Sequence, residues 1–234
     1  MASEVAQLDE VVDRTEALEE RGIARIEAFS DGVFAFAITL LVLGIHIPLP
    51  TDADASKGLK ALLLHQWPSY VAFALTFANV GIVWANHRLA FSHVVRSDRI
   101  LVSLNLLELM VVAFLPLPTA VLGEWATSDD PNRLTAVLFY GGTFVLLGIA
   151  HNLLWWYAAY WGCLTSPALT DYKRRALTLT WLGGPVLYAL CVALALVNPR
   201  LSIAGFAVLA IVYLLPTPRV ILAAQQARRQ RRGS

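Results

Sequence analysis

The sequence predicts an all-α, polytopic membrane protein with six transmembrane helices per chain. The first observation is composition: 57% of the 234 residues are hydrophobic and 15% are charged, far from the balance of a soluble domain. The second is that apolar segments of about 20 residues, the length that crosses a bilayer, recur along the chain. The third is the placement of the basic residues, which fits six crossings.

Lysine and arginine residues are distributed unequally between the loops that six crossings create. Fourteen of the 18 basic residues fall on one side of the membrane. The other four are Lys57, Lys60, Arg133 and Arg200. Because loops rich in Lys and Arg stay in the cytosol, we expect both termini to be cytoplasmic.

The chain begins with an acidic segment, residues 1–24, in which carboxylates are interspersed with apolar residues. A short amphipathic helix and a frayed acidic tail are both compatible with this pattern. Residues 25–223 are the expected transmembrane domain, and residues 224–234 are a basic cytoplasmic tail. The tail suits contact with lipid headgroups, so the bilayer rather than nucleic acid is the expected partner.

The first predicted span, Ala28–Ile47, ends where Pro48 begins a loop that we expect to continue to about His65. The five later spans are Trp67–Phe91, Ile100–Leu122, Leu134–Trp161, Ala176–Val197 and Leu201–Ala223. Pro116 and Pro118 are expected to break the far end of the third span.

The first span has two different sides. At about 100° per residue, one face carries large apolar groups and a single hydroxyl, whereas Asp31 projects roughly opposite. Ile38 and Val42 fall on the rear. This division suits a pore-lining helix that is braced from behind, and the alternative is an ordinary membrane helix with Asp31 in a structural network. The residues along the apolar face are Phe29, Gly32, Phe36, Thr39, Leu40, Leu43 and Ile47.

A few polar residues inside the spans need partners. An ionised carboxylate at the membrane border is costly unless it is paired, and His87 and Arg25 lie near enough to the same border to pair with Asp31. Glu108 follows Asn105 by three residues and so faces a similar direction. Glu108 and His151 can each be either structural or part of an ion path.

The sequence contains none of the motifs that define common enzymes and channels. It has no Walker motif, no TVGYG filter, no HExxH and no GxSxG. We therefore expect no catalytic residues, no metal site and no cofactor.

Three segments resemble the transmembrane protein 175 family. They are RIEAFSDGVFAFAITLLVLGI, WANHRLAF and LNLLELMVVAFLPLPTAVLG, and they occur in the family's order. The resemblance implies a potassium-selective or potassium-preferring cation channel of the leak type, without a separate filter loop. It also implies that the first helices surround a central pore and constrict it with bulky apolar side chains.

The resemblance assigns roles to individual residues. Phe36 would take the main constriction position, where the family usually has isoleucine. K⁺ is the only ion that the resemblance implies at the site. Leu40 and Leu43 would add further apolar rings, and Thr39 would supply a layer of hydroxyls. The network that orients the pore helix would consist of Arg25, Phe29, Ser30, Asp31, His87 and Asn105.

The chain has one six-helix repeat, whereas the family's animal members have two and assemble as dimers. The resemblance therefore implies a homotetramer. The single repeat, with 15 Arg against 3 Lys, indicates a bacterial plasma membrane. Two other functions stay open: a proton channel with Glu108, His87 or His151 as relays, and a non-conducting scaffold or carrier.

Overall fold

The computed structural model of the protein describes residues 2–51, 55–128 and 131–214, with side chains from Leu18 onward. In these ranges all regular elements are helices, and the only β-type pairing is an isolated bridge between Val94 and Thr165. The all-α prediction is therefore confirmed. In order, the helices are α1 (Ala2–Leu40), η1 (Leu41–Gly44), η2 (Ala55–Lys57), α2 (Leu59–His65), α3 (Trp67–Phe91), α4 (Arg99–Phe114), α5 (Pro116–Trp125), α6 (Asn132–Trp156), η3 (Tyr157–Trp161), α7 (Asp171–Ala195) and α8 (Pro199–Leu214).

Five of the described helical segments are long and apolar enough to cross a membrane. They are Leu18–Gly44, Trp67–Phe91, Arg99–Trp125, Asn132–Trp161 and Asp171–Ala195. The apolar helix α8 has 16 residues, which at 1.5 Å per residue span about 24 Å, less than the hydrocarbon core of a bilayer. The end of the sixth predicted span lies outside the described residues, so the count of six stays a prediction.

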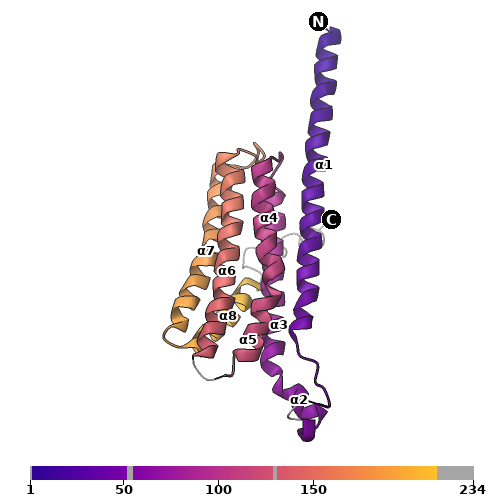
Figure 1. The fold of residues 1–234 in the computed structure, drawn as a ribbon. Coiled ribbons are helices and arrows are strands. Elements are labelled where there is room, and N and C mark those ends of the chain that lie inside the picture. Colours follow the sequence, from indigo (N-terminus) through magenta and orange to yellow (C-terminus); the bar gives the residue numbers. More distant parts are fainter. Residues whose placement is uncertain (1, 52–54, 129–130, 215–234) are drawn as a thin grey trace, which may run out of the picture.

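Helix α1 is much longer than the span predicted for it (Figure 1). It crosses the predicted boundary at residue 24 without a break and projects beyond the end of the bundle. Its predicted end at Ile47 is wrong, because the chain tightens into η1 after Leu40. A Cβ on Gly44 would lie 2.9 Å from the Cβ of Ala120, so a residue without a side chain lets this turn pack against α5.

The loop predicted up to His65 is partly helical, and this prediction is also wrong. The apolar run LKALLLH forms α2, which lies beyond the opposite end of the bundle from the N-terminus in Figure 1. The third span divides at Leu115 into α4 and α5, because Pro116 has no N–H to continue the ladder. Helix α7 begins at Asp171, before the predicted Ala176, because the hydroxyl of Thr170 accepts a hydrogen bond from the Lys173 N–H.

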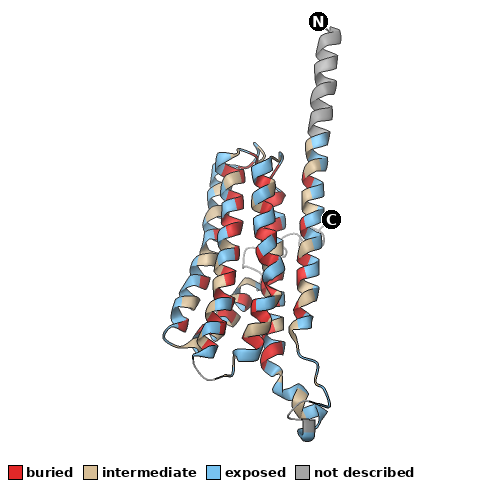
Figure 2. Cartoon of the chain, in the orientation of Figure 1, coloured by how far each residue is buried: buried red, intermediate tan, exposed pale blue. Residues whose placement is uncertain are grey.

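Helices α3 to α8 enclose the main core, and α1 packs on this bundle through contacts with α3 and α4 (Figures 1 and 2). An aromatic cluster fills the middle, with the Tyr188 ring stacked on Phe144 and Phe206 at centroid distances of 5.1 and 5.5 Å. The hydroxyl of Thr76 is hydrogen-bonded to those of Thr119 and Tyr140, so these three buried hydroxyls satisfy one another. Helix α1 thus packs on a bundle that has a well-filled core of its own.

Candidate functional site

Helix α1 buries one narrow stripe and exposes the opposite one. Ser30, Phe34, Ala37 and Leu41 are each at most 2% exposed, and their spacing of four, three and four residues is that of one helical face. This stripe packs on the bundle. Phe34 and Ala37 belong to the main hydrophobic core.

The exposed stripe contains the residues that the sequence assigns to a pore. Phe36 is 64% exposed and Leu43 is 75% exposed in the single chain, and Thr39 lies between them on the same side. Leu40 is half-buried at the edge of the stripe. The Thr39 hydroxyl donates to the Phe36 carbonyl at 2.7 Å, so its oxygen lone pairs are left for another partner. Such an apolar helical face is left for a neighbour or for lipid to cover.

The rear of α1 agrees only in part with the sequence. Ile38 is half-buried against the main core, as expected for a bracing residue. Val42, in contrast, is 51% exposed, so the bundle does not cover it. It follows the buried Leu41 by one residue, a step of about 100° that takes it off the buried stripe.

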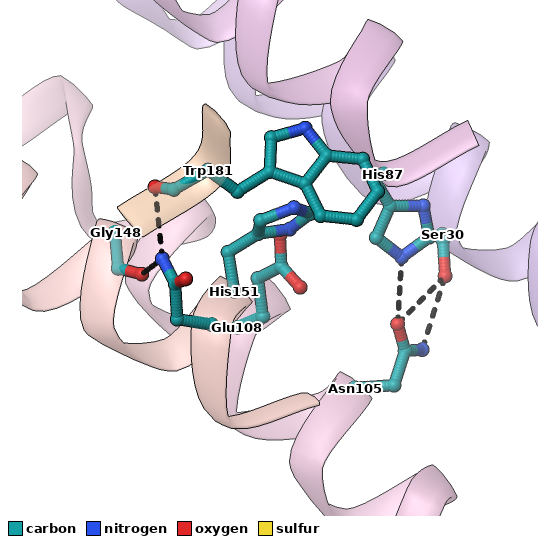
Figure 3. A network of polar contacts seen from close by, with 8 residues as sticks. Ser30, His87, Asn105, Glu108, Gly148, His151 and Trp181 are labelled. Carbon is teal, nitrogen blue, oxygen red and sulfur yellow. Dashed lines mark hydrogen bonds and ion pairs between the residues drawn. The ribbon is translucent and has the colours of Figure 1, made fainter. Parts of the chain in front are cut away.

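A buried hydrogen-bond network joins α1 to α3 and α4 (Figure 3). Asn105 donates from Nδ2 to Ser30 Oγ at 3.0 Å, and Ser30 donates in turn to the Ile26 carbonyl at 2.9 Å. Asn105 Oδ1 lies 2.8 Å from His87 Nε2, which therefore carries a proton. The three side chains are at most 2% exposed, so water does not replace these hydrogen bonds if one of them is lost.

Aromatic rings hold His87 in place. Its ring stacks on Phe91 at a centroid distance of 4.5 Å and meets Phe34 edge-on at 5.4 Å. Because Phe34 belongs to α1, the histidine contacts α1 by packing as well as through Asn105. The network determines which way α1 is turned, and hence which residues of α1 are exposed.

Asp31 has a different partner from the ones expected. Its Oδ1 accepts a hydrogen bond from the Trp84 indole N–H at 2.7 Å, and the Arg88 guanidinium lies over that indole at 5.2 Å. Pairing with His87 was wrong, because His87 is occupied by Asn105. Arg25 and Phe29 are exposed in the single chain, and neither belongs to the buried network.

A second buried polar cluster lies between α4 and α6 (Figure 3). The carboxylate of Glu108, which is fully buried, lies 3.0 Å from His151 Nδ1 on α6. The neighbouring Asn152 donates both amide protons, to the carbonyls of Gly148 and Trp181. Asn105 therefore connects α4 to α1, whereas Glu108 connects α4 to α6.

Sequence reasoning missed the roles of Trp84 and Asn152. The available signal for Trp84 is that it precedes His87 by three residues and so shares its face of α3. Nothing in the sequence identifies Trp181 as the neighbour of Asn152. Among the described residues, no group of three His, Cys, Asp or Glu side chains could hold a metal ion.

Comparisons with known proteins place this geometry in a family. Residues 25–116 match the model of the family described as endosomal/lysosomal potassium channel TMEM175. A protein from Streptomyces collinus named as a potassium channel is 43% identical over 189 residues, which is 81% of this chain and 90% of the relative.

Two further relatives are informative. The crystal structure of a TMEM175 homologue from Chamaesiphon minutus, described as a lysosomal potassium-selective channel homologue, superimposes with a TM-score of 0.74 at 40% identity, covering 82% of this chain and 96% of that one. The human endosomal/lysosomal proton channel TMEM175 is 32% identical over 78% of this chain, although the match covers only 35% of the human protein. The motif segments, the fold and this coverage together show that the chain belongs to the TMEM175 family.

Proposed function

We propose that the protein is a potassium-preferring cation channel of a bacterial plasma membrane. The observation that carries the proposal is the exposed apolar stripe of α1, which is fixed in orientation by the Ser30, His87 and Asn105 network. The potassium-channel names of two relatives that match nearly their whole length support it. Conduction follows the K⁺ gradient and needs no cofactor and no metal other than K⁺.

The channel is a homotetramer in this proposal, with four copies of α1 around one axis. A single α1 exposes its stripe but encloses no passage, and closed symmetry brings identical faces together. Each subunit then contributes Phe36, Leu40 and Leu43 as stacked apolar rings, and Thr39 as a ring of hydroxyl oxygens. Narrow apolar passages exclude water, which gives a hydrated cation its main barrier.

Both termini are cytoplasmic in this arrangement. Basic residues gather where α3 ends and α4 begins, at Arg88, Arg96 and Arg99. Two more, Lys173 and Arg174, lie at the start of α7. These ends come together at one end of the bundle, toward which the N-terminal part of α1 extends (Figure 1). The positive-inside rule assigns that end to the cytosol.

Bilayer recording from the purified full-length protein tests the proposal directly. With K⁺ on one side and Na⁺ on the other, we expect single-channel steps and a reversal potential shifted toward the K⁺ equilibrium potential. The absence of steps from protein shown to be folded and oligomeric would support a scaffold or carrier instead.

Proton conduction is a second candidate, favoured by the buried pair of Glu108 and His151 and by the human relative named as a proton channel. Replacing K⁺ with N-methyl-D-glucamine while keeping a pH gradient separates the two functions. Current that persists and follows the pH gradient indicates protons, whereas current that disappears indicates K⁺.

A further inference from the structure

The Glu108, His151 and Asn152 cluster contains three buried polar atoms without a hydrogen-bond partner among the described residues. They are Glu108 Oε2, His151 Nε2 and Asn152 Oδ1. A buried polar atom that is left unpaired costs about 1 to 3 kcal/mol, and three in one place point to a missing partner. The cluster does not contact the exposed face of α1.

The unpaired atoms are acceptors. Asn152 uses both of its amide protons, so only its oxygen remains free. With Glu108 ionised and His151 neutral, His151 donates from Nδ1 to the carboxylate, and its Nε2 keeps a lone pair. The missing partner must therefore donate hydrogen bonds, and the carboxylate favours one that is positively charged.

A cavity of about 140 Å³ lies between α3, α6, α7 and α8. Glu108 is not part of its wall, and its carboxylate lies behind His151, 3.0 Å from His151 Nδ1. His151 and Asn152 contribute to its wall, and Asn79, Asn86 and Thr180 add polar groups. Most of the wall is apolar and includes the rings of Phe144, Trp181 and Tyr188. A cavity of roughly this size holds a molecule as large as benzene.

Aromatic walls, free acceptors and a nearby carboxylate together select a small organic cation. Aromatic faces attract ammonium groups, and the apolar wall suits a hydrocarbon body of one ring. A bare alkali ion fits less well, because it needs a shell of oxygen ligands that this wall does not supply. We propose that the cavity is a binding site, one per subunit, for a monoammonium ligand about the size of one aromatic ring.

Two glycines of α7 provide a matched pair of variants. A Cβ added at Gly183 or at Gly184 meets nothing within 4 Å, so both positions accept a side chain. Gly184 lines the cavity, whereas Gly183 does not. Gly184→Leu should fill the cavity, and Gly183→Leu should leave it open while making the same change in helix propensity.

The experiment is calorimetric titration of the purified full-length protein with benzylammonium, with benzyl alcohol as a neutral probe of similar size. We expect saturable binding of one benzylammonium per chain, lost in Gly184→Leu and kept within about twofold in Gly183→Leu. Asn152→Ala should weaken binding by about tenfold, because it removes an acceptor in the cavity wall, and Glu108→Gln should do the same, because it removes the negative charge behind His151. Benzyl alcohol should bind more weakly and should not respond to Glu108→Gln.

Three results would overturn the proposal. Equal binding of the two probes would show that the cavity is only an apolar space. Unchanged affinity in Glu108→Gln, with melting behaviour matching the wild type, would remove the carboxylate from the site. No saturable binding in the wild type or in Gly183→Leu would leave water as the partner of the three atoms. Because no readout depends on ion flux, these outcomes are independent of whether the protein conducts K⁺.

Discussion

At the scale of single residues, Asn105 joins α1 to two other helices. Its amide pairs with a hydroxyl on α1 and an imidazole on α3, so one side chain connects three helices. Without Asn105, the buried His87 Nε2 would lose this partner, and Ser30 would keep only its bond to the Ile26 carbonyl. Trp84 acts similarly for Asp31, but at a site that is open to solvent in the single chain.

Asn105→Ala should destabilise the protein by about 2 to 4 kcal/mol, because it leaves the buried His87 Nε2 without this partner and removes the donor to Ser30 Oγ. The thermal unfolding midpoint in detergent measures the loss. Ser103→Ala is the control, because Ser103 is exposed on the same helix and bonds only to the Arg99 carbonyl. If both variants melted like the wild type, the network would not hold α1.

The pair of Asp31 and Trp84 should show coupling in a double-mutant cycle. Asp31→Asn removes the charge and Trp84→Phe removes the donor of one charge-assisted hydrogen bond. Because the pair is partly exposed, we expect a coupling free energy of about 1 kcal/mol between the two substitutions. The cycle is read from unfolding midpoints. Additive effects of the two substitutions would show that the bond contributes nothing.

The part of the site that depends on one helix could be predicted from the sequence, and the part that depends on how two helices pack could not. The exposed face of α1 follows from helical geometry alone, and the sequence therefore places Phe36, Thr39 and Leu43 on one side correctly. The partner of Asp31 depends on how α3 is rotated against α1, which no local pattern specifies. The change from α-helix to a 3₁₀ turn at Leu41 was not predicted, because it leaves no clear signal in the run ITLLVLG.

At the scale of elements, the helix boundaries are set by caps and prolines. The span Trp67–Phe91 is predicted to the residue, because Pro68 fits the first turn of a helix and polar residues follow Phe91. The helix α2 was missed because its seven residues, LKALLLH, are too few to show a helical repeat of apolar positions. The capping residues can therefore be tested by substitution, through their contribution to stability.

Asp98 caps α4, and its contribution should depend on pH. Burial raises the pKa of its carboxyl, but the N–H groups of Leu101 and Ile100 and the Tyr157 hydroxyl outweigh burial and hold the pKa below its usual value. A lowered pKa in the folded state means that the stabilisation is present above the unfolded value and is lost as pH falls through the folded one.

Asp98→Ala should thus lower the unfolding midpoint at pH 7, by the equivalent of about 1 kcal/mol, and should have less effect near pH 3. Unfolding midpoints of both proteins across this range provide the measurement. Glu124→Ala, near the end of α5, is the control for loss of a carboxylate. A difference between Asp98→Ala and wild type that does not change with pH would contradict the capping role.

The two faces of α1 should respond differently to truncation. Leu41→Ala empties a site that is 2% exposed and should cost about 2 to 5 kcal/mol. Phe36→Ala removes an exposed ring, so it should leave the subunit fold intact and raise the cation current by widening the constriction. Liposome flux normalised to folded tetramer, together with melting curves, separates the two. Reduced flux in Phe36→Ala would remove Phe36 from the barrier.

At the scale of the whole molecule, the proposed pore needs more than one chain. The buried stripe of α1 joins the main core, and its exposed apolar stripe faces away from that core (Figure 2). In a bilayer, lipid could cover such a stripe as well as another protein could, so exposure alone does not require assembly. The test must therefore ask whether these faces meet one another.

Cysteine cross-linking answers that question. In a background with Cys163→Ser and Cys191→Ala, Phe36→Cys should form disulfides between subunits under mild oxidation in membranes. Ala37→Cys is the matched control: it is the next residue along the helix but is 1% exposed and packs on its own bundle, so it should form none. Around a closed axis, neighbouring Phe36 positions lie close enough for the short reach of a disulfide, whereas Ala37 positions are separated by the width of α1.

A cross-linked dimer from Phe36→Cys, with four chains per particle by native mass spectrometry, supports a ring of α1 helices. Cross-linking at Ala37 but not at Phe36 would place the subunit contact on the opposite side of α1 and refute the proposed pore.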